Sequence, residues 1–241
     1  MKRFCLFVLP LCVLLGAVRA DYINSPGWEN DPYFTHQSWS FSGPDNPALP
    51  DDGGAGNPYG TAVLTMSGAQ WVDDLGMVYD PGTFHPLGQR QGGFAIVGPQ
   101  DDAEWFSVTI PNVANPSMVK EVWFEFTFRV SDMELAGVIA NRVSLSVYAD
   151  GIVDGDHAFD YFDEAGGVIG VSALGEIWLR FEGKFSYDPQ PGSELMILVG
   201  NLDPGQSVCL DQVDIDTHCV PEPTTLGLLG LGALGLLRRR R

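Results

Sequence analysis

Basic residues are scarce through most of this 241-residue chain. The sequence holds 13 Lys and Arg against 31 Asp and Glu, and seven of the basic residues lie within the first twenty or the last four positions. Residues 21–219 therefore combine thirty acidic with six basic side chains, a formal charge of about −24. Nucleic acids and anionic membrane surfaces attract clusters of positive charge, so this composition argues against nucleic acid as a partner.

Cysteine is scarce too, with four residues in all, of which Cys5 and Cys12 lie in the apolar first twenty positions. An exported chain would keep only Cys209 and Cys219, and an oxidising compartment favours a disulfide between them. A straight strand would separate the two by about 33 Å, whereas a bridge needs Cα atoms about 5–6 Å apart. The disulfide hypothesis therefore requires the chain to turn back near residues 216–218; two free thiols are the alternative.

Enzyme motifs are absent from the sequence. It contains no Gly-x-Ser-x-Gly elbow, no His-Glu-x-x-His zinc helix and no glycine-rich phosphate loop before a helix. The four histidines have no zinc-ligand spacing. Thirty acidic residues make a carboxylate pair of glycosidase spacing inevitable by chance. We therefore predict no enzymatic activity, no catalytic residue and no cofactor, with a carbohydrate-active enzyme as the least favoured alternative.

Residues 1–20 have the three-part layout of a secretory signal peptide. Lys2 and Arg3 precede an apolar run over residues 4–18, and small residues around 17–20 offer a cleavage site. This layout predicts the Sec translocon and signal peptidase as partners. A permanent anchor is less favoured because the apolar run is short. A lipoprotein at Cys12 is less favoured because the bulky Leu11 precedes that cysteine.

Strand signals fill the rest of the body. Residues 21–60 are rich in Pro, Gly, Asn and Asp with interspersed aromatics, and they predict an irregular segment that packs on the domain formed by residues 61–219. Within that domain, alternating apolar and polar residues or short apolar runs predict strands at 61–66, 71–79, 93–97, 105–110, 119–130, 142–149, 176–187, 194–200 and 207–216. No window of a dozen residues has a helical period. The predicted fold is all-β, a single antiparallel jelly-roll-like β-sandwich.

Two groups of residues suggest ligands. The first is a turn-rich acidic stretch whose oxygens suit a structural Ca²⁺ site, with a solvated acidic loop as the favoured alternative; the candidate ligands are Asp150, Asp154, Asp156 and Asp160. The second is a set of aromatics on the faces opposite the apolar rows, where sugars could stack on exposed rings. These glycan-binding candidates are Trp123, Trp178 and Tyr148, although packing against neighbouring loops is the simpler role for each.

The most specific signal lies at residues 220–241. Pro221 and Pro223 flank Glu222 and cannot continue a strand ladder. Residues 224–237 follow without a charge and would form a helix only about 21 Å long, against a hydrocarbon core of roughly 30 Å. An arginine cluster that would stay on the cytoplasmic side comes last, formed by Arg238, Arg239, Arg240 and Arg241. An ordinary buried helix with a basic terminus is the alternative.

This order of Val220, Pro221, Glu222 and Pro223, an apolar segment and a basic cluster resembles the PEP-CTERM sorting signal. The resemblance implies processing by exosortase, a membrane protease-transpeptidase, and a transient membrane stay through residues 224–237. It also implies an inner-membrane intermediate that ends in the cell envelope, on the surface or in an extracellular polysaccharide matrix. Separately, residues 210–215 resemble the closing strands of galactose-binding-like jelly rolls, which makes a carbohydrate-binding module the alternative to a non-enzymatic matrix protein.

Overall fold

The computed structural model describes residues 27–80, 82–130, 133–139, 142–150, 152–153, 167–172 and 174–221. Twelve strands and one short helix make up this part of the chain, and every strand pairing is antiparallel. The elements are β1 (Thr35–Trp39), β2 (Val63–Met66), β3 (Gln70–Tyr79), β4 (Pro86–Val97), β5 (Gln100–Pro111), β6 (Met118–Val130), α1 (Met133–Val138), β7 (Val143–Ala149), β8 (Ile152–Val153), β9 (Gly167–Ser172), β10 (Ile177–Tyr187), β11 (Ser193–Leu202) and β12 (Ser207–Pro221).

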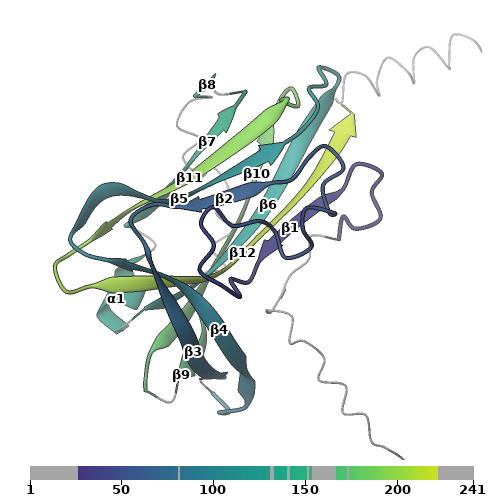
Figure 1. Ribbon diagram of the computed structural model, residues 1–241. Helices are drawn as coiled ribbons and strands as arrows, with labels where there is room; N and C mark the ends of the chain where they lie inside the picture. The colour runs from purple at the N-terminus through teal and green to yellow at the C-terminus, as the bar shows by residue number, and fades with distance from the viewer. Residues whose placement is uncertain are drawn as a thin grey trace, which may run out of the picture.

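The all-β prediction is confirmed, and two sheets face each other across one main core (Figure 1). The smaller sheet has the order β2-β5-β11-β7-β8, and the larger has the order β1-β12-β4-β3-β9-β10-β6. Alternation along β6 explains the packing between them, because Phe124, Phe126 and Phe128 all point into the core and are at most 2% exposed. Aromatic edges from the other sheet, such as Phe106 against Phe126, fill the space between these rings.

The larger sheet differs from the predicted open sandwich because it closes on itself. β12 pairs with β4 at its start and with β6 along most of its length, so that β12, β4, β3, β9, β10 and β6 form a six-stranded ring. Figure 1 shows the β3–β4 hairpin and β9 projecting away from the end of β12. The ring encloses a second, smaller core made by Leu75, Val78, Trp178 and Cys209.

A register shift in β12 allows this one strand to belong to both the closed ring and the sandwich. The shift lies between Leu210 and Gln212, and a bulge of this kind reverses which residues face the core. Leu210 faces the core before the bulge, and Val213 and Ile215 face it afterwards. After the bulge β12 leaves β4 and pairs with β1 on that side. β12 is therefore the element that joins the ring to the sandwich.

Residues 27–62 pack along the open edge of the sandwich. The segment predicted to be irregular includes the strand β1, which pairs with β12 from Thr35↔Thr217 to Trp39↔Val213. Trp39 and Phe41 enter the main core. A bridge between Ala48 and Leu64 then ties the segment to β2 of the other sheet. The segment thus links the edges of the two sheets.

Candidate functional site

The last described strand ends inside the predicted sorting motif. β12 runs to Pro221, and its last residues Val220 and Pro221 pair with Val119 and Met118 of β6. The remaining predicted residues of the motif lie outside the described part of the chain: Glu222, Pro223, Arg238, Arg239, Arg240 and Arg241. So do residues 224–237, and no helix among the described residues is long and apolar enough to cross a bilayer. The described part of the chain therefore ends in a strand that is held in the sheet.

A charged cluster fastens the start of the body to this last strand. Nδ1 of His218 lies 2.7 Å from Oδ2 of Asp31, and Nε2 lies 2.8 Å from Oε2 of Glu121. Each ring nitrogen faces a carboxylate, and both can donate only when the imidazole is protonated. The ring of Trp28 stacks on His218 with centroids 3.9 Å apart. We call this group the His218 clasp.

Lys184 completes the His218 clasp. Its Nζ lies 2.7 Å from Oε2 of Glu121 and 4.9 Å from the ring centroid of Trp28. Burial alone raises the pKa of Glu121, but hydrogen bonds from His218 and Lys184 outweigh burial, so the pKa lies below its usual value. The glutamate is therefore ionised in the folded protein. The clasp joins residues almost two hundred positions apart, which no local sequence pattern could reveal.

A second histidine lies one strand away. Nδ1 of His36 on β1 lies 2.6 Å from Oδ1 of Asp216. Burial lowers the pKa of His36, but the hydrogen bond and charge of Asp216, aided by Asp214 and Asp52, give a net increase. Burial also raises the pKa of Asp214 to about 6, against hydrogen bonds from Ser38 and Gln212. The pKa values of both Asp214 and His36 are therefore higher than those of the same side chains in water.

The disulfide prediction is wrong. Cys209 and Cys219 are both free and buried, and they lie on the single continuous strand β12. The expected turn near residues 216–218 is absent because those residues pair with β6 and, up to Thr217, with β1. Burial raises the pKa of Cys209 to about 12 and that of Cys219 to about 11. Neither thiol is poised to act as a nucleophile.

The exposed aromatic rings that we predicted as sugar platforms are mostly buried. Trp178 is 0% exposed inside the closed ring, where the guanidinium of Arg90 lies 5.5 Å from its ring centroid. Trp123 is 7% exposed. The expectation of exposure fails because the larger sheet curls over its own second face. Tyr148 is half-buried and lies on the face of β7 opposite the core residues Leu145 and Val147.

The predicted calcium ligands are mostly outside the described residues, namely Asp154, Asp156 and Asp160. Asp150 is described, and its Oδ1 accepts a hydrogen bond of 2.9 Å from the backbone of Ser193. That bond secures the end of β7 against β11. Within the described residues no three His, Cys, Asp or Glu side chains gather closely enough to hold a metal ion. The calcium site stays a prediction.

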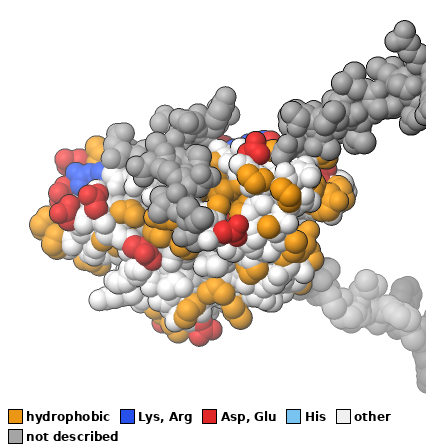
Figure 2. Space-filling view, turned by 90° about the horizontal axis from the view of Figure 1, so that it is seen from above, with side chains coloured by type: hydrophobic (Ala, Val, Ile, Leu, Met, Phe, Trp, Pro, Cys, Tyr) orange, Lys and Arg blue, Asp and Glu red, His pale blue; other side chains and the backbone are white. Residues whose placement is uncertain are grey.

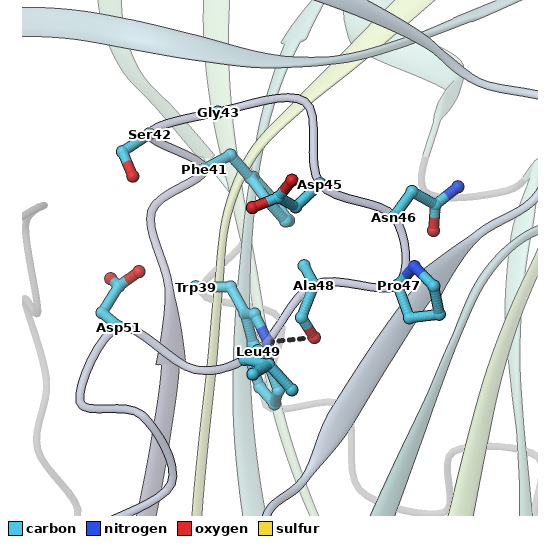
Figure 3. Close-up of a pocket in the computed structure, with 10 residues that line it drawn as sticks. All are labelled: Trp39, Phe41, Ser42, Gly43, Asp45, Asn46, Pro47, Ala48, Leu49 and Asp51. Carbon is cyan, nitrogen blue, oxygen red and sulfur yellow. Dashed lines mark hydrogen bonds between the residues drawn. The ribbon is translucent and has the colours of Figure 1, made fainter.

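A pocket of about 360 Å³ opens in the loop that follows β1 (Figure 3). Trp39 and Phe41 line it together with loop residues from Ser42 to Asp51. Figure 3 shows the loop folding back on itself, with Ser42, Asp45 and Asp51 among the side chains that line the pocket. The composition of residues 44–60 predicted only turns and loop. The pocket depends on pairings with β1 and β2, so the sequence offered no signal for it.

Comparison with known proteins identifies the tail. Residues 220–241 match the PEP-CTERM protein-sorting motif. The PEP-CTERM match begins at Val220, within β12, and it confirms the resemblance stated from the sequence. The motif supports sorting of this protein by exosortase, with export and association with the cell surface or envelope.

No curated protein matches the sequence. One similar solved structure is the enzymatically active domain of tailspike protein 4 from bacteriophage CBA120, with 12% sequence identity and a TM-score of 0.23. The alignment covers 80% of this chain and 20% of that chain, so the protein spans about a fifth of the tailspike domain's length.

Proposed function

We propose that this protein is a non-enzymatic component of the cell surface that exosortase releases from the membrane into an extracellular polysaccharide matrix. The observation that carries the proposal is the PEP-CTERM match at residues 220–241. The Sec translocon and signal peptidase would act first on residues 1–20, as the leader's layout predicts. The membrane stay would be brief, because the apolar segment is shorter than the hydrocarbon core.

The body has properties that suit an extracellular setting. Its surface carries scattered acidic side chains with few basic ones among them, as Figure 2 shows for one face. A high net charge of one sign keeps a protein soluble and discourages self-association. The two-sheet core is large and rich in aromatics, so the fold does not depend on a disulfide for its stability.

Several contacts favour a structural role for the reactive side chains. Both thiols are buried with raised pKa values, and both ring nitrogens of His218 are occupied by carboxylates. The buried pair of Lys120 and Glu194 lies between the sheets with Nζ and Oε1 2.5 Å apart. These groups hold elements together, which supports the proposal of a role without catalysis.

Fractionation of the producing cells tests this proposal. We would compare the natural chain with a variant in which Pro221, Glu222 and Pro223 are all replaced by Ala, and with the natural chain in cells without exosortase. We expect the natural chain in the matrix fraction and both comparisons in the membrane fraction. The exposed Pro204→Ala change is the matched control and should leave sorting unaltered. Matrix localisation of the triple variant would contradict the proposal.

A further inference from the structure

The loop between β1 and the Ala48 bridge is a fixed frame around the pocket. The backbone N–H of Asp51 donates to the carbonyl of Ser38 at 2.7 Å, and that of Ser40 donates to Oδ2 of Asp51 at 3.0 Å. These two bonds close the base of the loop. A loop held in this way loses little conformational entropy when a ligand binds, which favours affinity.

The far side of the loop is anchored to the other sheet. The side chain of Asn46 donates to the carbonyl of Met66 at 2.8 Å and accepts from its N–H at 2.9 Å. Nε1 of Trp39 donates to the carbonyl of Ala48 at 3.2 Å, a bond drawn in Figure 3. Phe41 adopts φ 43°, a left-handed backbone conformation that non-glycine residues rarely adopt and that clusters at binding sites. The pocket is therefore formed before any ligand arrives.

The polar groups of the pocket are open acceptors. Within the described part of the chain no hydrogen bond occupies the carboxylate of Asp45, and Oδ1 of Asp51 is likewise open. Ser42 adds a hydroxyl group to the lining of the pocket. Leu49 contributes an apolar wall that is 59% exposed. Apolar walls with a few convergent polar groups in a preformed hollow are typical of small-molecule sites.

The charge of the pocket restricts the ligand. Two carboxylates line the space, and no Lys or Arg does. Carboxylates accept hydrogen bonds from hydroxyl donors, and a charged partner makes such bonds stronger. An anionic ligand would be repelled by both carboxylates, since no cation offsets them. The lining therefore suits a neutral molecule with adjacent hydroxyls and an apolar C–H face.

We propose that the pocket formed by Trp39, Phe41 and residues 42–51 binds a neutral pyranose unit of a polysaccharide and excludes uronic acids. Asp45 and Asp51 would accept hydrogen bonds from sugar hydroxyls, and Leu49 would contact the apolar face of the ring. This inference rests on the proposed function, since it names the contact through which the surface protein would be retained in the matrix.

Titration of the mature protein, purified from the surface of producing cells, tests the pocket. The probes are cellotetraose and mannotetraose as neutral oligosaccharides and tetragalacturonic acid as the anionic counterpart. We expect saturable heat from at least one neutral probe and none from tetragalacturonic acid. Asp45 is exposed and makes no hydrogen bond to any other described residue, so Asp45→Ala should fold normally and weaken binding about tenfold.

Asp101→Ala is the matched control, because it removes the same charge from an exposed position outside the pocket. Binding should be unchanged in this variant. Absence of heat from both neutral probes, equal loss in both variants, or binding of tetragalacturonic acid would each overturn the inference. A protein that is found in the matrix but binds no sugar would overturn only the proposal of sugar binding at the pocket. A protein absent from the cell surface would overturn the proposed function instead.

Discussion

At the scale of single residues, Cys209 and Cys219 give the simplest test of the structure. Their thiols are buried, and burial raises the pKa of Cys209 to about 12 and that of Cys219 to about 11. Since the thiolate is the reactive form, we expect neither cysteine of a chain starting at Asp21 to react with a disulfide reagent at neutral pH while folded. The measurement is the colour released by Ellman's reagent over several minutes.

The unfolded chain provides the control for this thiol prediction. In the folded protein β12 holds the two cysteines apart, so no disulfide joins them. Both thiols should therefore react once the chain is unfolded in concentrated guanidinium chloride without reductant. If no thiol appears until a reductant is added, the two cysteines are bridged and the placement of β12 is contradicted. Rapid reaction of the folded chain would show instead that the burial of the thiols is wrong.

The raised pKa values of Asp214 and His36 predict that the stability of the fold decreases as the pH rises. Burial raises the pKa of Asp214 to about 6, so the folded state keeps a proton that the unfolded state loses near pH 4. Stability should therefore decrease between about pH 4 and pH 6. The pKa of His36 is raised as well, so its contribution is complete below about pH 6.5 and is lost as pH rises through the folded value. The measurement is the thermal midpoint as a function of pH.

Two variants separate these contributions. Asp214→Asn should flatten the decrease between about pH 4 and pH 6, and His36→Gln should flatten the decrease at higher pH. Glu121 acts in the opposite direction. Its pKa is lowered in the folded state, so its contribution to stability is present at neutral pH and is lost as the pH falls into the acid range. A thermal midpoint that rises steadily from about pH 5 to pH 8 would contradict this account of Asp214 and His36.

At the scale of strands, alternation predicted the elements that have one apolar face. The pattern of residues 119–130 predicted β6, and the structure confirms this strand, with its phenylalanines in the core. The pattern of residues 176–187 likewise predicted β10. Such strands can be predicted from the sequence because one buried face produces an alternation of apolar and polar residues with a period of two. β1 was missed because Thr35, His36 and Gln37 give no apolar alternation; pairing with β12 makes the strand.

The second face of the larger sheet was not readable from the sequence. Glu125 and Thr127 alternate with the phenylalanines of β6 and form the polar face of that strand, yet both are at most 2% exposed. They are buried because β12 pairs with β6 and closes the sheet, a contact between positions some ninety residues apart. The pocket escaped prediction for a similar reason, since its shape comes from bonds to β1 and β2. Long-range pairing leaves no local signature.

Close contact between β6 and β10 yields a prediction at this scale. Gly183 pairs with Phe124, and a Cβ at Gly183 would lie 2.4 Å from the Phe124 ring. That ring is held by Phe126, stacked with centroids 4.8 Å apart, so it cannot easily withdraw. We expect Gly183→Ala to lower the free energy of unfolding by about 1–3 kcal/mol. Chemical denaturation monitored by tryptophan fluorescence would measure it.

Gly137 offers the matched control for this substitution. It is exposed in α1, and a Cβ there would meet open space. Gly137→Ala should therefore be neutral or stabilising by up to about 1 kcal/mol, since alanine is the better helix former. If both alanine variants have the same stability as the natural chain, Phe124 does not pack on Gly183 as the structure shows.

At the scale of the whole molecule, the two ends of the described body lie near each other and near the sorting motif. The His218 clasp ties residues 28–31 to β12, so the two ends of the folded body meet close to the start of the sorting motif. β12 pairs with β6 through Pro221, which places the boundary between body and tail inside the motif. The strands of both sheets and the lining of the pocket all belong to residues up to Pro221.

The identity of the mature C-terminus tests the central claim most directly. We would purify the protein from the surface of the producing cells and from the same cells without exosortase, and determine intact mass and C-terminal peptides. The account predicts that the surface protein has lost Arg238, Arg239, Arg240 and Arg241, and that cells without exosortase retain them. Recovery of a chain with its intact arginine cluster from the cytosol of normal cells would contradict it.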